Sequence, residues 1–227
     1  MTPDAAEAAS LLAVAQLADS AFPSGGFAFS QGLETLLAEG RVAGEAGIAA
    51  FLRRQMAMRW LPLDRWFLCA AHRQRQDHAA LAALDRELEA MTPAAGLRAG
   101  SARNGLALLT SHARLATEGA AAYRLAVMEG RALGHLPVVQ GLVLGNRGLA
   151  LLPAQTVAAH AALIGPITAA VRLGALGTLA GQRLLAELQP LVAEGLAQPP
   201  EEPWSFTPLA EIAAMRHETQ DLRLFST

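Results

Sequence analysis

The hydrophobic positions of this 227-residue chain recur with the period of an α-helix along most of its length. Leu81, Leu84 and Leu88, for example, lie at offsets 0, 3 and 7 and share one helix face, while Asp85 and Glu89 fall on the expected solvent side. This pattern predicts helices over residues 5–18, 27–39, 45–60, 63–75, 77–90, 93–116, 118–133, 138–146, 153–190 and from 208 onward, with a short helix to 197.

Prolines mark several of the expected helix boundaries. Pro62 should interrupt the helical pattern, and Thr92 should cap a helix whose first residue is Pro93. Pro166 should kink the long late helix, and Pro190 should end it, because proline lacks the N–H that a helix interior needs.

Composition supports the same fold class. Alanine and leucine are abundant, whereas aromatic residues make up 5% and tyrosine occurs once, so a large sheet is not expected. We expect an all-α, single-domain multi-helix bundle of about nine to eleven helices with an appended C-terminal helical tail. The expected organisation is a helical domain over 1–197, a proline-rich connector over 198–207 and a tail helix over 208–227.

All 18 basic residues are arginine, and the chain has no lysine. This absence excludes the usual Walker A phosphate loop, Schiff-base catalysis and an internal pyridoxal linkage. The base composition of a GC-rich genome would also explain it, and the exclusion holds in either case. The net charge of -2 gives no attraction to nucleic acid or to an anionic membrane, so protein or small-molecule partners are expected.

A cytoplasmic location fits the cysteine content and the first residues. The single cysteine, Cys69, can form neither an intramolecular disulfide nor a structural cysteine-based zinc site. The first ten residues carry Asp4 and Glu7 but no basic region, which is unlike a secretory signal.

One stretch, residues 161–181, raises the question of a membrane span. It contains a single charge, Arg172, and the small-residue spacing Gly177 to Gly181. Arginine near the centre of a span is unfavourable, and Pro166 and several glycines contribute little hydrophobicity. A buried helix or a dimer contact is therefore the favoured interpretation, and a membrane-associated helical protein is the alternative.

Candidate chemistry is sparse. The histidines are poorly spaced for a metal, and His217, Glu218 and Asp221 match the zinc signature H-E-x-x-H only in its first half. His217 and Asp221 are four residues apart and could share a divalent metal, which leaves a metal-dependent hydrolase as an alternative function. No nucleophile elbow or paired carboxylates stand out. We expect no catalytic, cofactor or metal site.

Three ordered segments carry a family resemblance. They are Leu17 to Glu34, which contains Pro-Ser-Gly-Gly-Phe-Ala-Phe-Ser-Gln-Gly-Leu-Glu, then Val171 to Gln182, and finally Met215 to Ser226 with Arg-His-Glu-Thr-Gln. Together they resemble the UreF family of urease accessory proteins, colinearly over nearly the whole chain. Ala28 and Phe29 depart from the residues that the family prefers.

The resemblance implies an all-helical, dimer-forming chaperone subunit without an active site. In that family the protein binds a second accessory protein, UreD (also called UreH), and recruits the GTPase UreG. The assembly inserts nickel into apo-urease as GTP is hydrolysed. The absence of lysine agrees with a phosphate loop on another chain.

On this basis the turn after the first helix, the tail and Arg172 become candidate contacts. The glycines of the turn could instead merely permit a tight connection, and Arg172 could be buried at a dimer seam or snorkel within its own chain. The tail could fold only on binding. The candidate partner-binding residues are Pro23, Gly25, Gly26, Ser30, Gln31, Glu34, Arg172, Arg216, His217, Glu218, Gln220, Arg223, Leu224 and Phe225.

Overall fold

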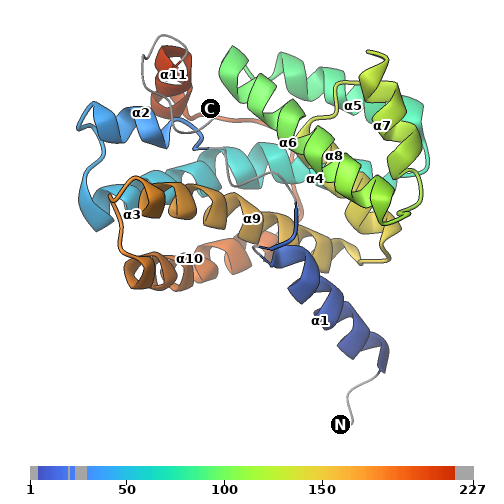
Figure 1. Cartoon of the computed structure of the whole chain (residues 1–227), viewed down its shortest axis with the longest axis horizontal. Helices are drawn as coiled ribbons and strands as arrows, with labels where there is room; N and C mark the ends of the chain where they lie inside the picture. Colours follow the sequence, from blue (N-terminus) through green and yellow to red (C-terminus); the bar gives the residue numbers. More distant parts are fainter. Residues whose placement is uncertain (1–4, 20, 24–29, 218–227) are drawn as a thin grey trace.

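The computed structural model describes residues 5–19, 21–23 and 30–217. These residues form eleven α-helices and one π-helical segment without a strand, which confirms the all-α prediction (Figure 1). The elements are α1 (Ala5–Ala18), α2 (Leu33–Ala38), α3 (Gly44–Gln55), η2 (Met56–Asp64), α4 (Arg65–Arg73), α5 (His78–Ala90), α6 (Ala95–Arg114), α7 (Ala120–Met128), α8 (Leu136–Asn146), α9 (Leu151–Arg172), α10 (Thr178–Ala197) and α11 (Pro208–His217).

Two hydrophobic clusters make the core, and α4 and α9 belong to both. The first cluster joins these helices to α5, α6, α7 and α8, and the second joins them to α2, α3, α10 and α11. On α4, Phe67 faces the first cluster and Leu68 the second. Gly141 lets α8 lie directly against α4, since a Cβ there would be 2.5 Å from the carbonyl oxygen of Leu68. Because α4 and α9 contribute to both clusters, the helices around the two clusters pack into a single body (Figure 1).

Pro62 does not interrupt the chain's helical path, contrary to the prediction. The helix changes from α3 to the π-helical segment η2 and continues into α4. A proline at position 62 leaves the carbonyl of Met58 without its α-helical donor, and the N–H of Phe206 donates to that oxygen at 2.9 Å. The N–H of Trp204 donates to the carbonyl of Pro62 at 3.4 Å. The connector before α11 is thus held along η2.

The single helix predicted over 153–190 is wrong, because the chain breaks into α9 and α10. Gly174 adopts a left-handed conformation, with φ of 70°, in the turn between them. Pro190, the predicted end, lies inside α10 instead. Arg65 supports the end of α10, where its guanidinium donates to the carbonyls of Gly195, Leu196 and Gln198.

Other predicted boundaries also need correction. Thr92 does not cap α6, since its hydroxyl donates back to the carbonyl of Leu88 at 2.9 Å and α6 begins at Ala95. The helix predicted over 118–133 is shorter and covers Ala120–Met128. In the helix predicted over 27–39, residues 30–32 form a turn and α2 begins at Leu33.

Asp85 is fully buried, although the sequence pattern placed it on the solvent side. Its carboxylate accepts hydrogen bonds from the Tyr123 hydroxyl at 2.6 Å and from the N–H groups of Leu133, Gly134 and His135 at 3.1, 2.7 and 2.8 Å. The acid therefore organises the loop between α7 and α8.

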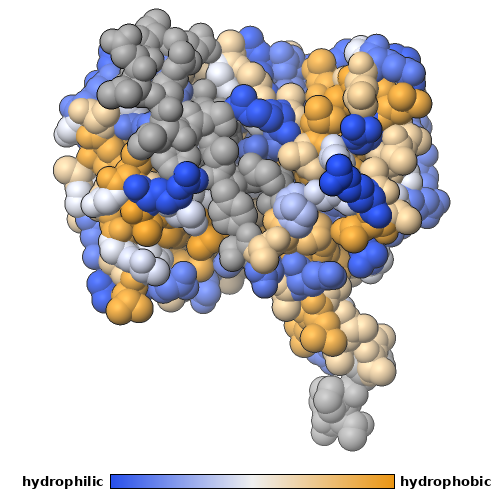
Figure 2. All heavy atoms as spheres, in the orientation of Figure 1, coloured by the Kyte–Doolittle hydropathy of each residue, from blue (hydrophilic) through white to orange (hydrophobic). Residues whose placement is uncertain are grey.

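Among the described helices, α9 alone has the length and apolar content of a membrane span. However, 61% of that apolar window is buried inside the fold. Its side chains, such as Val157 and Leu163, contribute to both core clusters, so packing within the protein accounts for its composition. By contrast, α1 extends away from the body and carries hydrophobic surface (Figures 1 and 2).

Candidate partner-binding site at the seam of α2 and α11

The turn before α2 requires glycine because the C-terminal helix lies against it. Gln31 and Gly32 both have left-handed backbones, with φ of 54° and 83°. A Cβ on Gly32 would lie 2.8 Å from the carbonyl oxygen of Ala210 and 3.2 Å from the Cβ of Ala213. Alanines on one face of α11 therefore meet the bare backbone of the turn. We call this contact between α2, its turn and α11 the α2–α11 seam.

Polar side chains cross the interior of the seam. His217, at the end of α11, is 2% exposed, and its Nδ1 lies 3.3 Å from the Thr35 hydroxyl. The Nε2 of the same ring lies 3.8 Å from a carboxylate oxygen of Glu34, which is itself buried. Because these side chains are buried, each of these polar contacts helps to satisfy a group that is removed from water. α2, early in the chain, is joined at this point to α11, the last described helix.

An ion pair closes the outer edge of the seam. Arg216 on α11 approaches Glu39, just after α2, with 3.2 Å between Nη1 and a carboxylate oxygen. Both side chains reach solvent, so the pair contributes little to stability, about 0–1 kcal/mol. Its charged groups are accessible to a partner.

The outward face of α11 is apolar. Ala213 and Ala214 pack inward, and Ala214 also joins Leu97 of α6. Ile212 and Met215 are 46% and 45% exposed on the other side. A helix that presents two large apolar side chains beside an accessible ion pair is a suitable contact surface for another protein.

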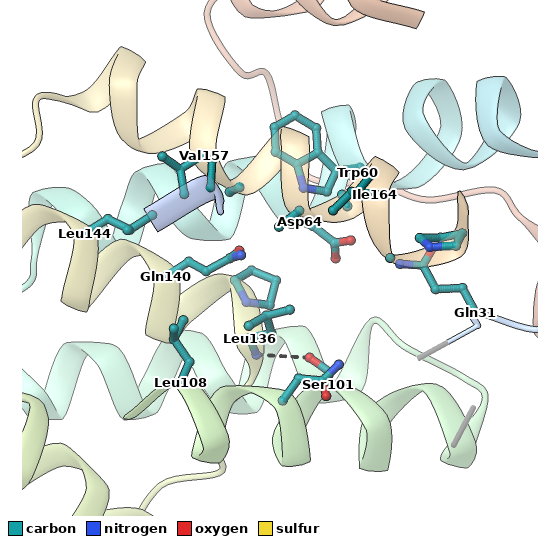
Figure 3. A pocket seen from close by; sticks show the side chains of 18 of the residues that line it. Gln31, Trp60, Asp64, Ser101, Leu108, Leu136, Gln140, Leu144, Val157 and Ile164 are labelled. Atoms are coloured by element: carbon teal, nitrogen blue, oxygen red, sulfur yellow. Dashed lines mark hydrogen bonds between the residues drawn. The ribbon is translucent and has the colours of Figure 1, made fainter. Parts of the chain in front are cut away.

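A cleft opens beside the seam, between α6 and α8 on one side and η2 and α9 on the other. Gln31 of the seam lines it together with Trp60, Asp64 and Gln140 (Figure 3). Within it Arg59 and Asp64 form an ion pair with 3.6 Å between Nε and Oδ2. Burial raises the pKa of Asp64, and the charges of Arg59 and His135 partly oppose that shift. The cleft thus combines apolar walls with one charged pair.

The cleft also contains polar atoms that the described residues leave unsatisfied. Nε2 of His112 and Nη1 of Arg59 are buried without a hydrogen-bond partner there. Burial, and to a lesser degree the charge of Arg147, lowers the pKa of His112 to about 4, so its ring is neutral near pH 7. Within the described ranges no three His, Cys, Asp or Glu side chains are grouped to hold a metal ion. The arrangement is suited to binding through hydrogen bonds and apolar contact.

The UreF family profile matches residues 42–189 of this chain. The chain is also similar over nearly its full length to proteins named "Urease accessory protein UreF". This chain belongs to the UreF family. The relative from Paracoccus denitrificans (strain Pd 1222) is 37% identical over 234 residues, covering 99% of this chain and 98% of the relative. Those from Cereibacter sphaeroides (strain ATCC 17029 / ATH 2.4.9) and Actinobacillus pleuropneumoniae are 34% and 31% identical, covering 96% and 94% of this chain and 99% and 97% of theirs.

In this UreF-family chain the structure brings together several of the predicted contact residues. Gln31, Glu34, Arg216 and His217 meet at the α2–α11 seam. Ser30 adjoins them, and its buried hydroxyl has no partner among the described residues. The resemblance had identified the two segments, and their contact in space is a finding of the structure.

Other predicted contact residues do not belong to the seam. The carbonyl of Pro23 accepts a hydrogen bond from the hydroxyl of Ser111 on α6 at 2.6 Å. Arg172 ends α9 and its side chain is exposed in the single chain, and its burial in a dimer stays a prediction. The remaining contact candidates lie outside the described residues, namely Gly25, Gly26, Glu218, Gln220, Arg223, Leu224 and Phe225, as does Asp221 of the alternative metal cluster.

Sequence reasoning did not name Gly32 as a contact residue of this UreF-family chain, and it missed three further residues of the seam. Thr35 and Glu39 supply the partners of His217 and Arg216, and Ala210 meets Gly32. Thr35 and Glu39 are four residues apart, which is the spacing of one helix face. That spacing was the one feature of the sequence that could have grouped these two residues on a common surface. Their partners are distant in sequence and give no local pattern.

Proposed function

We propose that this chain is a chaperone subunit of urease maturation that acts by holding other proteins together. It binds an accessory protein of the UreD/UreH type and recruits a UreG-type GTPase, and the complex inserts nickel into apo-urease. The chain itself has no catalytic role, because the GTPase supplies nucleotide hydrolysis. Membership of the UreF family and the names of its relatives support the role in urease maturation.

The α2–α11 seam is the observation that best supports a scaffolding role. Two segments, one early and one late in the chain, form one surface, with Ile212, Met215 and the Arg216–Glu39 ion pair accessible on it. Apolar side chains with charged groups beside them are typical of protein contacts, where arginine is enriched. The seam supplies a combined surface that neither segment could provide alone.

We propose further that the protein is cytoplasmic and works as a homodimer, with Arg172 and the turn between α9 and α10 at or near the contact between copies. Gly174 and Gly177 make this turn compact, and a Cβ on either would meet no atom within 4 Å in the single chain. The free space on this turn would let a second copy approach closely.

Co-expression tests the proposal directly. The full chain is produced with a tagged UreD/UreH-type accessory protein, with and without the GTPase, and complexes are captured and weighed by native mass spectrometry. We expect a binary complex that gains the GTPase when it is present. Finding no complex under either condition would contradict the proposed function. A variant lacking residues 204–227 should keep the helical signal of the body but bind partners more weakly.

The geometry does not favour the hydrolase alternative. His217 is buried in the seam, where Thr35 and Glu34 surround its ring. Metal analysis of purified chain and of His217→Ala checks this, and a metal content that drops in the variant would favour the alternative. The membrane alternative is likewise not favoured, because α9 is a core helix of the body.

A further inference from the structure

We propose that α1 is a docking helix that inserts into an apolar groove of a partner protein. The inference rests on the proposed function, since the partner is a member of the maturation complex. It names a second contact surface, remote in sequence from α11. The groove must have apolar walls on more than one side and no charged floor.

The first observation is how little of α1 the body covers. Leu17 is its one buried residue, and Ala13 and Val14 pack partly against the first core cluster. Leu11 and Leu12 are 64% and 72% exposed. Figure 2 shows hydrophobic surface along this helix where it extends from the body. Its contacts with the fold therefore lie in its C-terminal part.

The second observation is the distribution of polarity around α1. Apart from Ser10 and Gln16, its side chains other than Glu7 are alanine, leucine or valine. The helix has no distinct polar side, whereas an ordinary surface helix pairs an apolar stripe with a polar face. A helix of 14 residues is marginally stable in water on its own, so its order depends on tertiary contacts. Contact on a single side would leave apolar surface in water.

The size of the helix argues for an enclosing groove. A helix of this length is about 21 Å long and about 10 Å across, which gives roughly 650 Å² around its sides. A specific interface needs about 800 Å² from each partner. The C-terminal part of α1 already packs on the body, so a flat contact on the rest would fall well short of this area, whereas a groove would cover most of the surface that remains exposed. Together with the other surfaces of the chain, an enclosed α1 brings the contact to the required size.

A second copy of this chain is a poorer occupant. Two α1 helices packed on each other would each cover one face and leave the other in water. The large cleft that the described residues form is no substitute receptor. Its rim includes Leu17 and Ala18 of α1 itself, and it contains the Arg59–Asp64 ion pair. Placing an apolar helix there would desolvate that pair without replacing its hydration.

The test replaces the exposed leucines of α1 with acids. The variant Leu11→Glu/Leu12→Glu is compared with Leu125→Glu/Leu152→Glu, which makes the same charge change at leucines 52% and 57% exposed on the body. Both variants are combined with the UreD/UreH-type accessory protein, and affinity is measured by titration. We expect the α1 variant to weaken binding by about tenfold or more for each leucine. The control should stay within about threefold of the unmodified chain.

Hydrogen exchange on the unmodified chain provides an independent measurement. Amides of α1 should exchange rapidly in the free chain and become protected in the complex. An α1 variant that binds the partner like the unmodified chain, or α1 amides that stay unprotected, would overturn the inference while leaving the proposed function intact. If the α1 variant instead converts a dimer of the free chain to monomer, the occupant is a second copy. If even the unmodified chain binds no accessory protein, the proposed function fails as well.

Discussion

At the scale of single residues, His112 shows how burial turns an imidazole into a source of pH dependence. Its side chain is fully buried on α6, with Nδ1 2.9 Å from the Thr117 hydroxyl and its ring beside Phe22. Burial lowers its pKa from 6.5 to about 4. Between pH 6.5 and about pH 4, this histidine binds a proton in the unfolded chain but stays neutral in the folded chain. Stability must therefore fall as pH falls through this window.

We expect His112 to contribute a loss of about 2 kcal/mol in unfolding free energy between pH 7 and pH 5. Urea denaturation at the two pH values measures it, and the variant His112→Asn should lose that part of the pH dependence. His160→Asn is the comparison variant: burial lowers the pKa of that half-buried histidine as well, so we expect its replacement to remove a smaller part of the pH dependence than His112→Asn does. An equal pH dependence in unmodified chain and His112→Asn would show that His112 is not the source.

At the scale of elements, Asp85 ties α5 to α7 and to the start of α8. Its carboxylate satisfies the Tyr123 hydroxyl and three backbone N–H groups of the loop that leads into α8. Asp85→Ala would leave these donors buried and unpaired, so we expect a loss of about 3–5 kcal/mol in unfolding free energy. Asp77→Ala, at the exposed N-cap of the same helix, should cost about 1 kcal/mol. Chemical denaturation of both variants measures the difference, and similar losses would contradict the assigned role.

Asp85 also illustrates what could and could not be predicted from the sequence. The helical period identified α5 correctly, yet it placed this acid in solvent because it considers one helix alone. The donors that make burial favourable come from residues 38 to 50 positions later. Likewise, Pro62 was expected to end a helix, but the π-helical segment and the N–H of Phe206 accommodate it. Local patterns predicted which segments are helical. Contacts with residues distant in sequence decided where those helices end and which of their polar residues are buried.

In the candidate site too, local segments could be predicted from the sequence but the contacts between them could not. Ser30, Gln31, Glu34 and the histidine of the tail, His217, were candidates through the family resemblance, whereas Gly32 lay within the same motif without being a candidate. Their relation was not predictable, because Thr35 and His217 are 182 positions apart and no periodicity joins them. The exposed apolar surface of α1 was also missed, since the helix pattern of residues 5–18 gives no information on whether the body covers it. Packing between distant elements had to be seen in three dimensions.

At the scale of the whole molecule, the α2–α11 seam joins an early segment of the chain to its last described helix, and Gly32 is the position at which this coupling can be broken. In Gly32→Ala the new methyl group would meet the carbonyl of Ala210 at 2.8 Å, so α11 must move away from the turn. Gly40→Ala is the matched control: its φ of +66° carries similar backbone strain, about 1–2 kcal/mol, but nothing lies within 4 Å of the added methyl.

Hydrogen exchange and partner capture measure the two consequences of this change. We expect Gly32→Ala to reduce protection of the α11 amides and to weaken capture of the accessory protein about tenfold, while amides of α4 and α8 keep their protection. Gly40→Ala should leave α11 packed against the turn and capture of the accessory protein unchanged. If Gly32→Ala released α11 without affecting capture, the combined surface of the seam would not be where the partner binds. The binding contribution would then have to come from another surface such as α1, which the leucine variants test separately.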